Sequence, residues 1–315
     1  MTRRIPPHEQ GAALINVLVL VGVLATLSTS LFDRLRLARA LEANRDGRAV
    51  QEAAVLAAET IAVASVGPAV PLPRAGLRFG DPAGLASAAL TPGGNCFNLN
   101  SVALGPPGRT ITRPLGVEQL ARLLTLLDVP QDEAARIAAA TADWIDVDQQ
   151  PGPGGAEDPA YARAATPYRT ASTPLAEVSE WRAVAGVTPA IYARARPHVC
   201  ALPETELSRP NLNSMAPADA PVLAAITGAA LATARDAIAA RPAAGWANLA
   251  DFWAQPLLAG RTVPADALRQ PELRDRWFTL TVTGRDPLQP IAATGLIDAS
   301  RVPARLVARR WGPEE

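Results

Sequence analysis

The sequence predicts an α+β protein in which a long N-terminal helix packs on a small antiparallel sheet and a large all-α insertion interrupts that sheet. Three observations lead to this fold class. Residues 11–66 keep helical spacing without a proline, which predicts one long helix. Strand patterns occur near residues 77–79 and again from Trp277 onward. The pattern between them is mainly helical, and strands on both sides of a helical block indicate an insertion rather than two tandem domains.

The composition excludes several classes of protein. The chain has 315 residues, of which 49% are hydrophobic, enough to bury a core and to exclude disorder throughout. It carries 30 arginines and no lysine against 30 acidic side chains, so its formal net charge is zero. A general nucleic-acid-binding protein needs a basic surplus to neutralise phosphates. We therefore expect no nucleic-acid partner.

The N-terminal helix begins with a candidate membrane span. From Gly11 to Phe32 the chain has no charged residue, and about 22 residues at about 1.5 Å each cover the hydrocarbon core of a bilayer. Arg3-Arg4 precedes this segment, which by the positive-inside rule places the rest of the chain outside the inner membrane. The helical pattern continues to Val66. A plain signal anchor followed by a stalk is the alternative.

The start of this helix carries a candidate processing signal. A short polar leader ends at Gly11, and a small residue and an apolar helix follow at once, in the sequence Glu9-Gln10-Gly11-Ala12-Ala13-Leu14-Ile15. This arrangement resembles the type IV prepilin class. The resemblance implies that prepilin peptidase cuts between Gly11 and Ala12. It implies a leader of residues 1–11 and an N-terminal helix of residues 12–66, with its transmembrane part at 12–32.

The fifth residue after this cut distinguishes subclasses of the type IV pilin-like superfamily. Major pilins carry a glutamate there, whose carboxylate can meet the amino terminus of a neighbour. This chain has Asn16, which is polar but cannot form that ion pair. The K minor pseudopilin of type II secretion typically lacks the glutamate, so Asn16 favours that subclass. Alternatively, Asn16 is only a tolerated polar residue in a membrane helix.

The remaining elements follow in order along the chain. Short strands are expected near Leu77–Phe79 and through Cys96–Val102. A helical pattern runs from Gly116 to about Asp143, with a stop and restart at Leu127–Pro130. Helices are then expected at Pro174–Ala185, Thr188–Ala195, Ala218–Ile226, Gly228–Ala240 and Leu249–Ala254, and strands at Trp277–Thr283, Ile291–Ile297 and Pro303–Trp311.

The whole chain resembles type II secretion system protein K. The resemblance rests on the leader and on local sequences typical of that family: Phe97-Asn98-Leu99-Asn100, Asp143-Trp144-Ile145-Asp146, Gly155-Ala156-Glu157-Asp158, Pro167-Tyr168-Arg169, Pro174-Leu175 with Glu180-Trp181-Arg182, and Asn211-Leu212-Asn213. It implies a pseudopilin fold, with the head formed by residues 67–114 and 256–315 and the helical insertion by residues 115–255.

The resemblance also implies a function. Members of this family are minor pseudopilins near the tip of the periplasmic pseudopilus, where they associate with the I and J minor pseudopilins, and a bulky head fits a cap. The implied protein is methylated, single-pass in the inner membrane, with its head in the periplasm. It takes part in protein secretion across the outer membrane and is not an enzyme. Another type IV pilin-like minor subunit is the alternative.

The densest acidic feature is the loop that follows Asp143. Asp146 and Asp148 are two residues apart, and Glu157 and Asp158 follow a glycine-rich turn. Carboxylates of one loop could wrap a calcium ion, but the spacing is not that of an EF-hand, and spacing alone favours a solvated acidic loop. Protein K is associated with bound calcium in its head, so the resemblance favours a structural calcium ion held by these four residues. Asp143 is a weaker candidate, on the preceding helix.

Cys96 and Cys200 are the only cysteines. In an oxidising periplasm they could form one disulfide between the strand region and the insertion. Two buried free thiols are the alternative, and the inferred compartment favours the bond. A Cα separation beyond about 7 Å would exclude it.

Two segments resemble helix-hairpin-helix elements, at Glu180–Pro197 and Ile238–Ala254. In DNA-binding versions a glycine-rich hairpin lets backbone N–H groups approach phosphate, but the first hairpin here reads Gly186-Val187-Thr188 without a second glycine. A sterile-alpha-motif-like packing unit is therefore favoured over a membrane-anchored DNA-binding protein. A hydrolase that uses His198 is a remoter alternative. His198 is two residues from Cys200, and this spacing in a strand or loop does not favour a catalytic pair.

Overall fold

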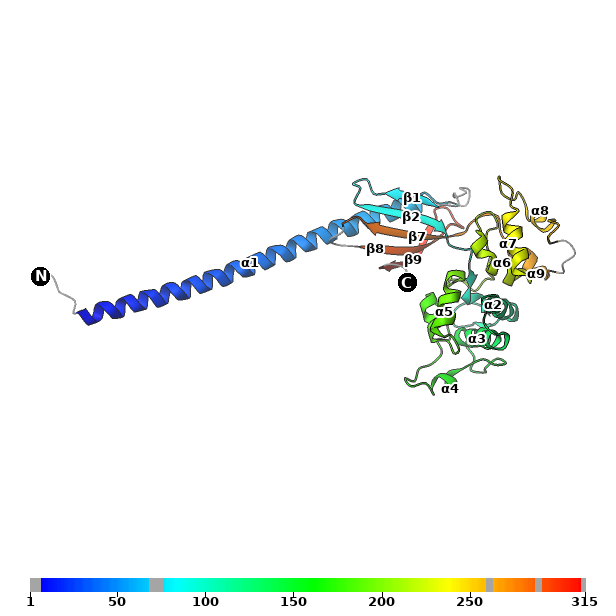
Figure 1. Ribbon diagram of the computed structural model, residues 1–315, viewed down its shortest axis with the longest axis horizontal. Helices are drawn as coiled ribbons and strands as arrows, with labels where there is room; N and C mark the ends of the chain where they lie inside the picture. The colour runs from blue at the N-terminus through cyan, green and yellow to red at the C-terminus, as the bar shows by residue number, and fades with distance from the viewer. Residues whose placement is uncertain (1–6, 68–75, 259–262, 287–290, 313–315) are drawn as a thin grey trace.

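A long helix projects from a head that combines a five-stranded sheet with a helical region (Figure 1). This computed structural model describes residues 7–67, 76–258, 263–286 and 291–312, with side chains in the long helix described from Leu14 onward. The helix, α1, runs from Pro7 to Ala64. The α+β class and the long N-terminal helix predicted from the sequence are confirmed.

Helix α1 has two parts in different surroundings. Every side chain from Leu14 to Asp46 is exposed, and this part projects away from the head (Figure 1). Further along, Val55, Ala58 and Ala62 have no exposed surface. Their spacing of three and four residues places them on one face of the helix, which packs on the sheet. The second part of α1 therefore belongs to the core of the head.

The sheet is antiparallel, with the strand order β1-β2-β7-β8-β9. Central strand β7 pairs Leu280 with Leu90 on one side and with Gly295 on the other. Leu90 and Leu280 are buried in the same core as the packed face of α1. The strands are β1 Leu77–Gly80, β2 Ala86–Pro92, β7 Trp277–Gly284, β8 Ala292–Asp298 and β9 Arg305–Trp311.

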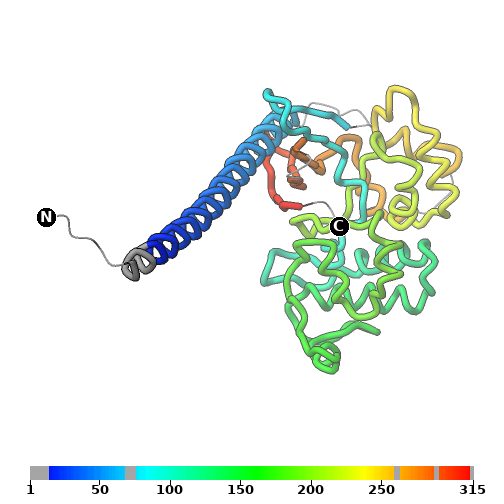
Figure 2. The backbone as a smooth tube through the Cα atoms, turned by 60° about the vertical axis from the view of Figure 1, so that its left-hand side comes forward, coloured from blue at the N-terminus to red at the C-terminus, as the bar shows by residue number. Residues whose placement is uncertain are grey.

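The chain leaves the sheet after β2 and returns at β7, so the inserted segment comprises residues 93–276, against the expected 115–255. It forms two lobes with separate cores, one around Trp181 and one around Phe252 (Figure 2). Its described elements are β3 Phe97–Asn98, η1 Leu99–Val102, β4 Ala103–Leu104, β5 Ile111–Thr112, α2 Pro114–Leu126, α3 Gln131–Ile145, α4 Asp158–Tyr161, η2 Val178–Ala183, α5 Pro189–Ala195, η3 Arg196–His198, β6 Val199–Cys200, η4 Pro217–Asp219, α6 Ala220–Thr227, α7 Leu231–Ala239, α8 Leu249–Trp253 and α9 Ala265–Arg269.

The expected strand through Cys96–Val102 is mostly wrong. Only Phe97–Asn98 is extended, and it pairs in parallel with β6. The Asn98 side chain accepts a hydrogen bond from the Asn100 N–H at 3.2 Å, which caps η1 and turns the chain out of the strand. The sequence prediction also missed β2, because alanine, its main residue, has a low strand propensity.

The expected helix Pro174–Ala185 is reduced to η2. Asn100, which is fully buried, accepts a hydrogen bond from Leu175 N–H at 2.7 Å and donates to Leu175 C=O at 2.9 Å. It also donates to Leu202 C=O at 2.9 Å. Both backbone groups of Leu175 are therefore bonded to a distant side chain instead of to a helical turn, which keeps this segment extended.

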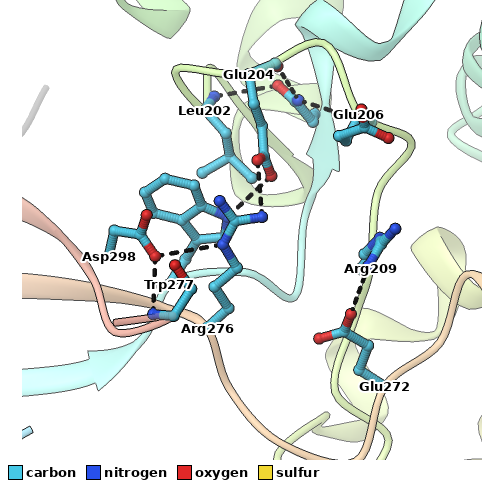
Figure 3. Close-up of polar contacts among 10 residues, drawn as sticks. Leu202, Glu204, Glu206, Arg209, Glu272, Arg276, Trp277 and Asp298 are labelled. Atoms are coloured by element: carbon cyan, nitrogen blue, oxygen red, sulfur yellow. Dashed lines mark hydrogen bonds and ion pairs between the residues drawn. The ribbon is translucent and has the colours of Figure 1, made fainter. Parts of the chain in front are cut away.

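A network of charged residues joins the insertion to the sheet where β7 begins (Figure 3). Arg276 Nη1 lies 2.8 Å from Glu204 Oε2, and its Nε lies 3.3 Å from Asp298 Oδ1 at the end of β8. The Trp277 indole N–H donates to Glu204 Oε1 at 3.1 Å. Arg276 thus bridges one carboxylate of the insertion and one of the sheet, and it helps to fix their relative position.

Candidate functional site

The acidic loop lies in the lobe around Trp181, between the end of α3 and the start of α4. Asp146 is the C-cap of α3, and Glu157 is the N-cap of α4. Asp148 follows α3 in the loop and is exposed. One carboxylate oxygen from each of these three residues lies within 4.8 Å of the others. Two helix termini and a loop therefore bring three acidic side chains to one place.

Several oxygens of this cluster are buried without a partner. Asp146 and Glu157 are each only 2% exposed. Asp146 Oδ2 accepts a hydrogen bond from the Thr112 hydroxyl at 2.6 Å, but Asp146 Oδ1 and both carboxylate oxygens of Glu157 have no hydrogen-bond partner among the described residues. Buried carboxylate oxygens without a partner are unfavourable, so the cluster fits a bound cation.

Burial raises the pKa values of the two buried members of the cluster. Burial raises the pKa of Glu157 to about 7, and the nearby charges of Asp143, Asp146 and Asp148 act in the same direction. Burial also raises the pKa of Asp146, against the effect of the Thr112 hydrogen bond. A cation placed among these oxygens would remove both the desolvation cost and the repulsion.

Asp143 supports the loop from the last turns of α3. It is 2% exposed, and its Oδ1 accepts a hydrogen bond from the Gly152 N–H at 3.1 Å. A Cβ on Gly155 would overlap the Asp143 carboxylate, so the loop needs glycine at that position. The structure thus places Asp143 on the helix, as expected, beside the cluster of Asp146, Asp148 and Glu157.

Asp158 lies outside this cluster of convergent carboxylates. Its Oδ1 accepts hydrogen bonds from the Thr170 N–H at 2.9 Å and the Thr170 hydroxyl at 3.0 Å, and its Oδ2 lies 3.9 Å from Arg169 Nε. It occupies the first turn of α4, whereas Glu157 caps the helix. Adjacent residues at a helix start point in different directions, which sequence spacing does not reveal.

Cys96 and Cys200 form a disulfide. The Sγ atoms are 2.01 Å apart and the Cα atoms 5.7 Å apart, inside the geometric limit for a bond. The pairing of β3 with β6 brings the two segments together, with Asn98 opposite Cys200. The disulfide links residues separated by 104 positions, close to where the insertion leaves the sheet.

Each of the two hairpins of the insertion contacts a neighbouring segment at its glycine. Gly186 has φ +87°, and a Cβ there would lie 2.9 Å from Ile137 Cγ1 of α3. Gly245 has φ +82° and lies against the Asn213 side chain in the same way. In the second hairpin, Trp246 and Trp253 contact the buried Phe252 edge-on, with ring centroids 5.8 and 4.9 Å away. Both hairpin glycines therefore face neighbouring protein.

Gly11 and Ala12 lie within α1, but their side chains lie outside the described residues. Asn16 is described and exposed. The apolar part of α1 is long enough to cross a membrane, and its side chains are not buried within the protein. The partners of this surface must therefore lie outside the chain.

Comparison with known proteins identifies the family. Two family models described as "Type II secretion system (T2SS), protein K" match residues 95–204 and 210–270. The Klebsiella pneumoniae type II secretion system protein K is 33% identical over 80% of this chain and 81% of its own. This chain belongs to the type II secretion system protein K family. The Pectobacterium carotovorum protein K is 29% identical over 97% of both chains.

The protein K fold is confirmed by a solved structure. A chain of the GspK–GspI–GspJ complex from the enterotoxigenic Escherichia coli type 2 secretion system matches with a TM-score of 0.68 and 28% identity, covering 89% of this chain and 100% of that chain. The chain is therefore a minor pseudopilin with a role in type II secretion. The first matched region contains the disulfide and the whole acidic loop, and each matched region coincides with one lobe of the insertion.

Proposed function

We propose that this protein K is a tip subunit of the pseudopilus, held in the inner membrane by α1 before assembly and with its head in the periplasm. Its partners would be an I-type and a J-type minor pseudopilin. Prepilin peptidase would remove residues 1–11 and leave a methylated Ala12. The observation that carries the proposal is the match, over 89% of the chain, to a chain of a complex that contains GspI and GspJ.

The shape of the head supports a terminal position. The insertion lies at the end of the head farthest from the start of α1 (Figure 1). In an assembly whose subunits stack along their N-terminal helices, residues 93–276 would occupy the space of the next subunit. The exposed first part of α1 supports the proposed anchorage in the inner membrane before assembly, because an apolar surface of this size requires a bilayer or other apolar helices around it.

We also propose that Asp146, Asp148 and Glu157 hold a structural calcium ion. The donors fit: calcium takes carboxylate oxygens from one flexible loop, and three oxygens of Asp146 and Glu157 are buried without a partner. When bound, the ion would neutralise the clustered charge and tie the end of α3 to the start of α4. Asp143 would position the loop through Gly152.

Co-purification tests the assembly. A chain that begins at Asp33 keeps the buried face of α1, and the described side chains that it removes, Leu14 to Phe32, are all exposed. We expect it to form a ternary complex with I- and J-type minor pseudopilins from the same secretion system. We expect a chelator, or the variant Asp146→Asn, to weaken that complex. If the complex fails to form in the presence of calcium, the proposed partners are contradicted. If the complex forms and neither the chelator nor the variant weakens it, only the proposed metal site is contradicted.

Mass spectrometry of the full chain tests the processing site. Replacing Gly11 by valine should leave an unprocessed precursor and stop secretion. The matched control is Gly22→Val, which lies inside the apolar segment with open space around it and should be cut normally. Cleavage of the Gly11 variant would contradict the leader assignment.

A further inference from the structure

Three arginines follow the apolar segment of α1 within seven residues of Phe32: Arg34, Arg36 and Arg39. Asp33 is the only acidic residue between Phe32 and Glu42. All three arginines are exposed, and they form no ion pair with another described residue. The first ion pair along the described part of α1 is Arg48 with Glu52, at 2.8 Å. A group of unpaired guanidinium groups therefore stands directly beside the candidate membrane span.

The position of these arginines along the helix matches the headgroup layer of a bilayer. At about 1.5 Å per residue, they lie roughly 3, 6 and 10 Å beyond Phe32. The polar layer on each side of the hydrocarbon core is about 5–7 Å thick, and long arginine side chains can reach back toward it. Arg45 and Arg48 lie roughly 20 Å or more beyond Phe32 by the same measure, outside that layer.

The distribution of the arginines around the helix favours lipid over a protein partner. Each residue turns the helix by about 100°, so Arg34 and Arg36 point to opposite sides and Arg39 lies nearer Arg36. A partner helix would contact only one side. Lipid headgroups surround the helix on every side, and a guanidinium group can bind a phosphate with two parallel hydrogen bonds.

We propose that Arg34, Arg36 and Arg39 form a collar that binds the phosphates of anionic phospholipids in the outer leaflet of the inner membrane. The inference rests on the membrane anchorage proposed above. The collar fixes the depth of α1, because a shift toward the cytoplasm would carry guanidinium groups into hydrocarbon. Residues 12–32 carry no charged side chain, so movement toward the periplasm would carry only the Ala12 amino group into hydrocarbon. The side-chain charges of the helix thus oppose movement inward and not movement outward.

Native mass spectrometry of the full chain tests the collar. The protein is placed in bilayer discs of equal parts phosphatidylcholine and phosphatidylglycerol, released, and the lipids that remain bound are counted. We expect the wild type to prefer phosphatidylglycerol by roughly fivefold for each arginine, less at high ionic strength. The triple variant R34Q/R36Q/R39Q should lose this preference, and glutamine preserves the helix propensity.

The matched control is R45Q/R48Q/R78Q, which removes three exposed arginines outside the headgroup layer. It should bind phosphatidylglycerol as the wild type does. An equal loss in the control, an unchanged preference in the collar variant, or a wild type without any preference would each overturn the inference. A wild type that does not enter the bilayer discs would instead contradict the membrane anchorage itself, and the collar with it.

Discussion

Replacing Asn100 by alanine should destabilise the insertion more than the same replacement of an exposed asparagine does. The Asn100 side chain is fully buried and makes three hydrogen bonds to backbone groups, namely to Leu175 N–H, Leu175 C=O and Leu202 C=O. These groups come from two segments that are 75 and 102 residues away along the chain. Alanine leaves both Leu175 groups without a protein partner, whereas Leu202 C=O keeps its hydrogen bond from the Glu204 N–H at 2.7 Å.

The magnitude follows from the number of orphaned groups. A buried backbone group without a partner costs about 1–3 kcal/mol. The two Leu175 groups give a loss of about 2–4 kcal/mol, in the lower part of the possible range because a water molecule can occupy the vacated space. The free energy of unfolding of a domain is about 5–15 kcal/mol, so this variant should lose a large part of its stability.

Urea unfolding of the chain that begins at Asp33, with calcium present, measures the loss. Asn248→Ala is the matched control, since this exposed asparagine caps α8 by accepting from the Asp251 N–H and donating to the Asp251 carboxylate, each at 2.9 Å. Its loss should cost about 1 kcal/mol. Hydrogen exchange gives a local readout, because the Leu175 amide loses its acceptor in the Asn100 variant. A loss no larger than that of the control, with unchanged protection of the Leu175 amide, would refute the reasoning.

Three further predictions concern the metal site, the disulfide and pH. Asp146→Asn should weaken calcium binding at least tenfold by calorimetry, whereas Asp158→Asn, outside the cluster, should leave it unchanged; equal effects would disprove the ligand set. Reduction of Cys96–Cys200 should cost about 2–4 kcal/mol in urea unfolding, and a C96S/C200S variant should no longer respond to reductant. Burial lowers the pKa of His198, so the unfolded chain takes up the proton first and stability falls as pH drops below about 6.5. The unfolding free energy should therefore fall less between pH 7 and pH 5 in His198→Gln than in the wild type. An equal fall in both proteins would contradict this coupling.

The expectations that held depend on short stretches of sequence. The absence of proline in residues 11–66 predicts a single helix, and α1 covers nearly the same span. The break at Leu127–Pro130 separates α2 from α3 as expected. The alternation from Trp277 predicts β7, whose side chains are alternately buried and exposed over most of its length. In each case the deciding pattern lies within one helix, one loop or one strand, where backbone geometry alone repeats it.

The expectations that failed depend on distant partners. Strand β2 has little strand propensity, and it forms because Leu90 and its neighbours pair with β7 across an insertion of more than 180 residues. The segment at Leu175 looks helical but is held extended by Asn100. Within the acidic loop, four carboxylates look equivalent in sequence, yet Thr170 and Arg169 draw Asp158 away from the other three.

The sequence by itself determined the long helix, its apolar first part, the arginines beside that part and the existence of an acidic loop, because these follow from local composition and spacing. Only the tertiary structure decided which carboxylates converge, how Cys96 reaches Cys200 and how the insertion is fixed to the sheet through Arg276. The physical reason is that these arrangements depend on contacts between different elements of the chain, from 12 positions apart for Asp158 and Thr170 to 104 for the two cysteines. Such contacts become favourable only when both segments have found their places in the fold.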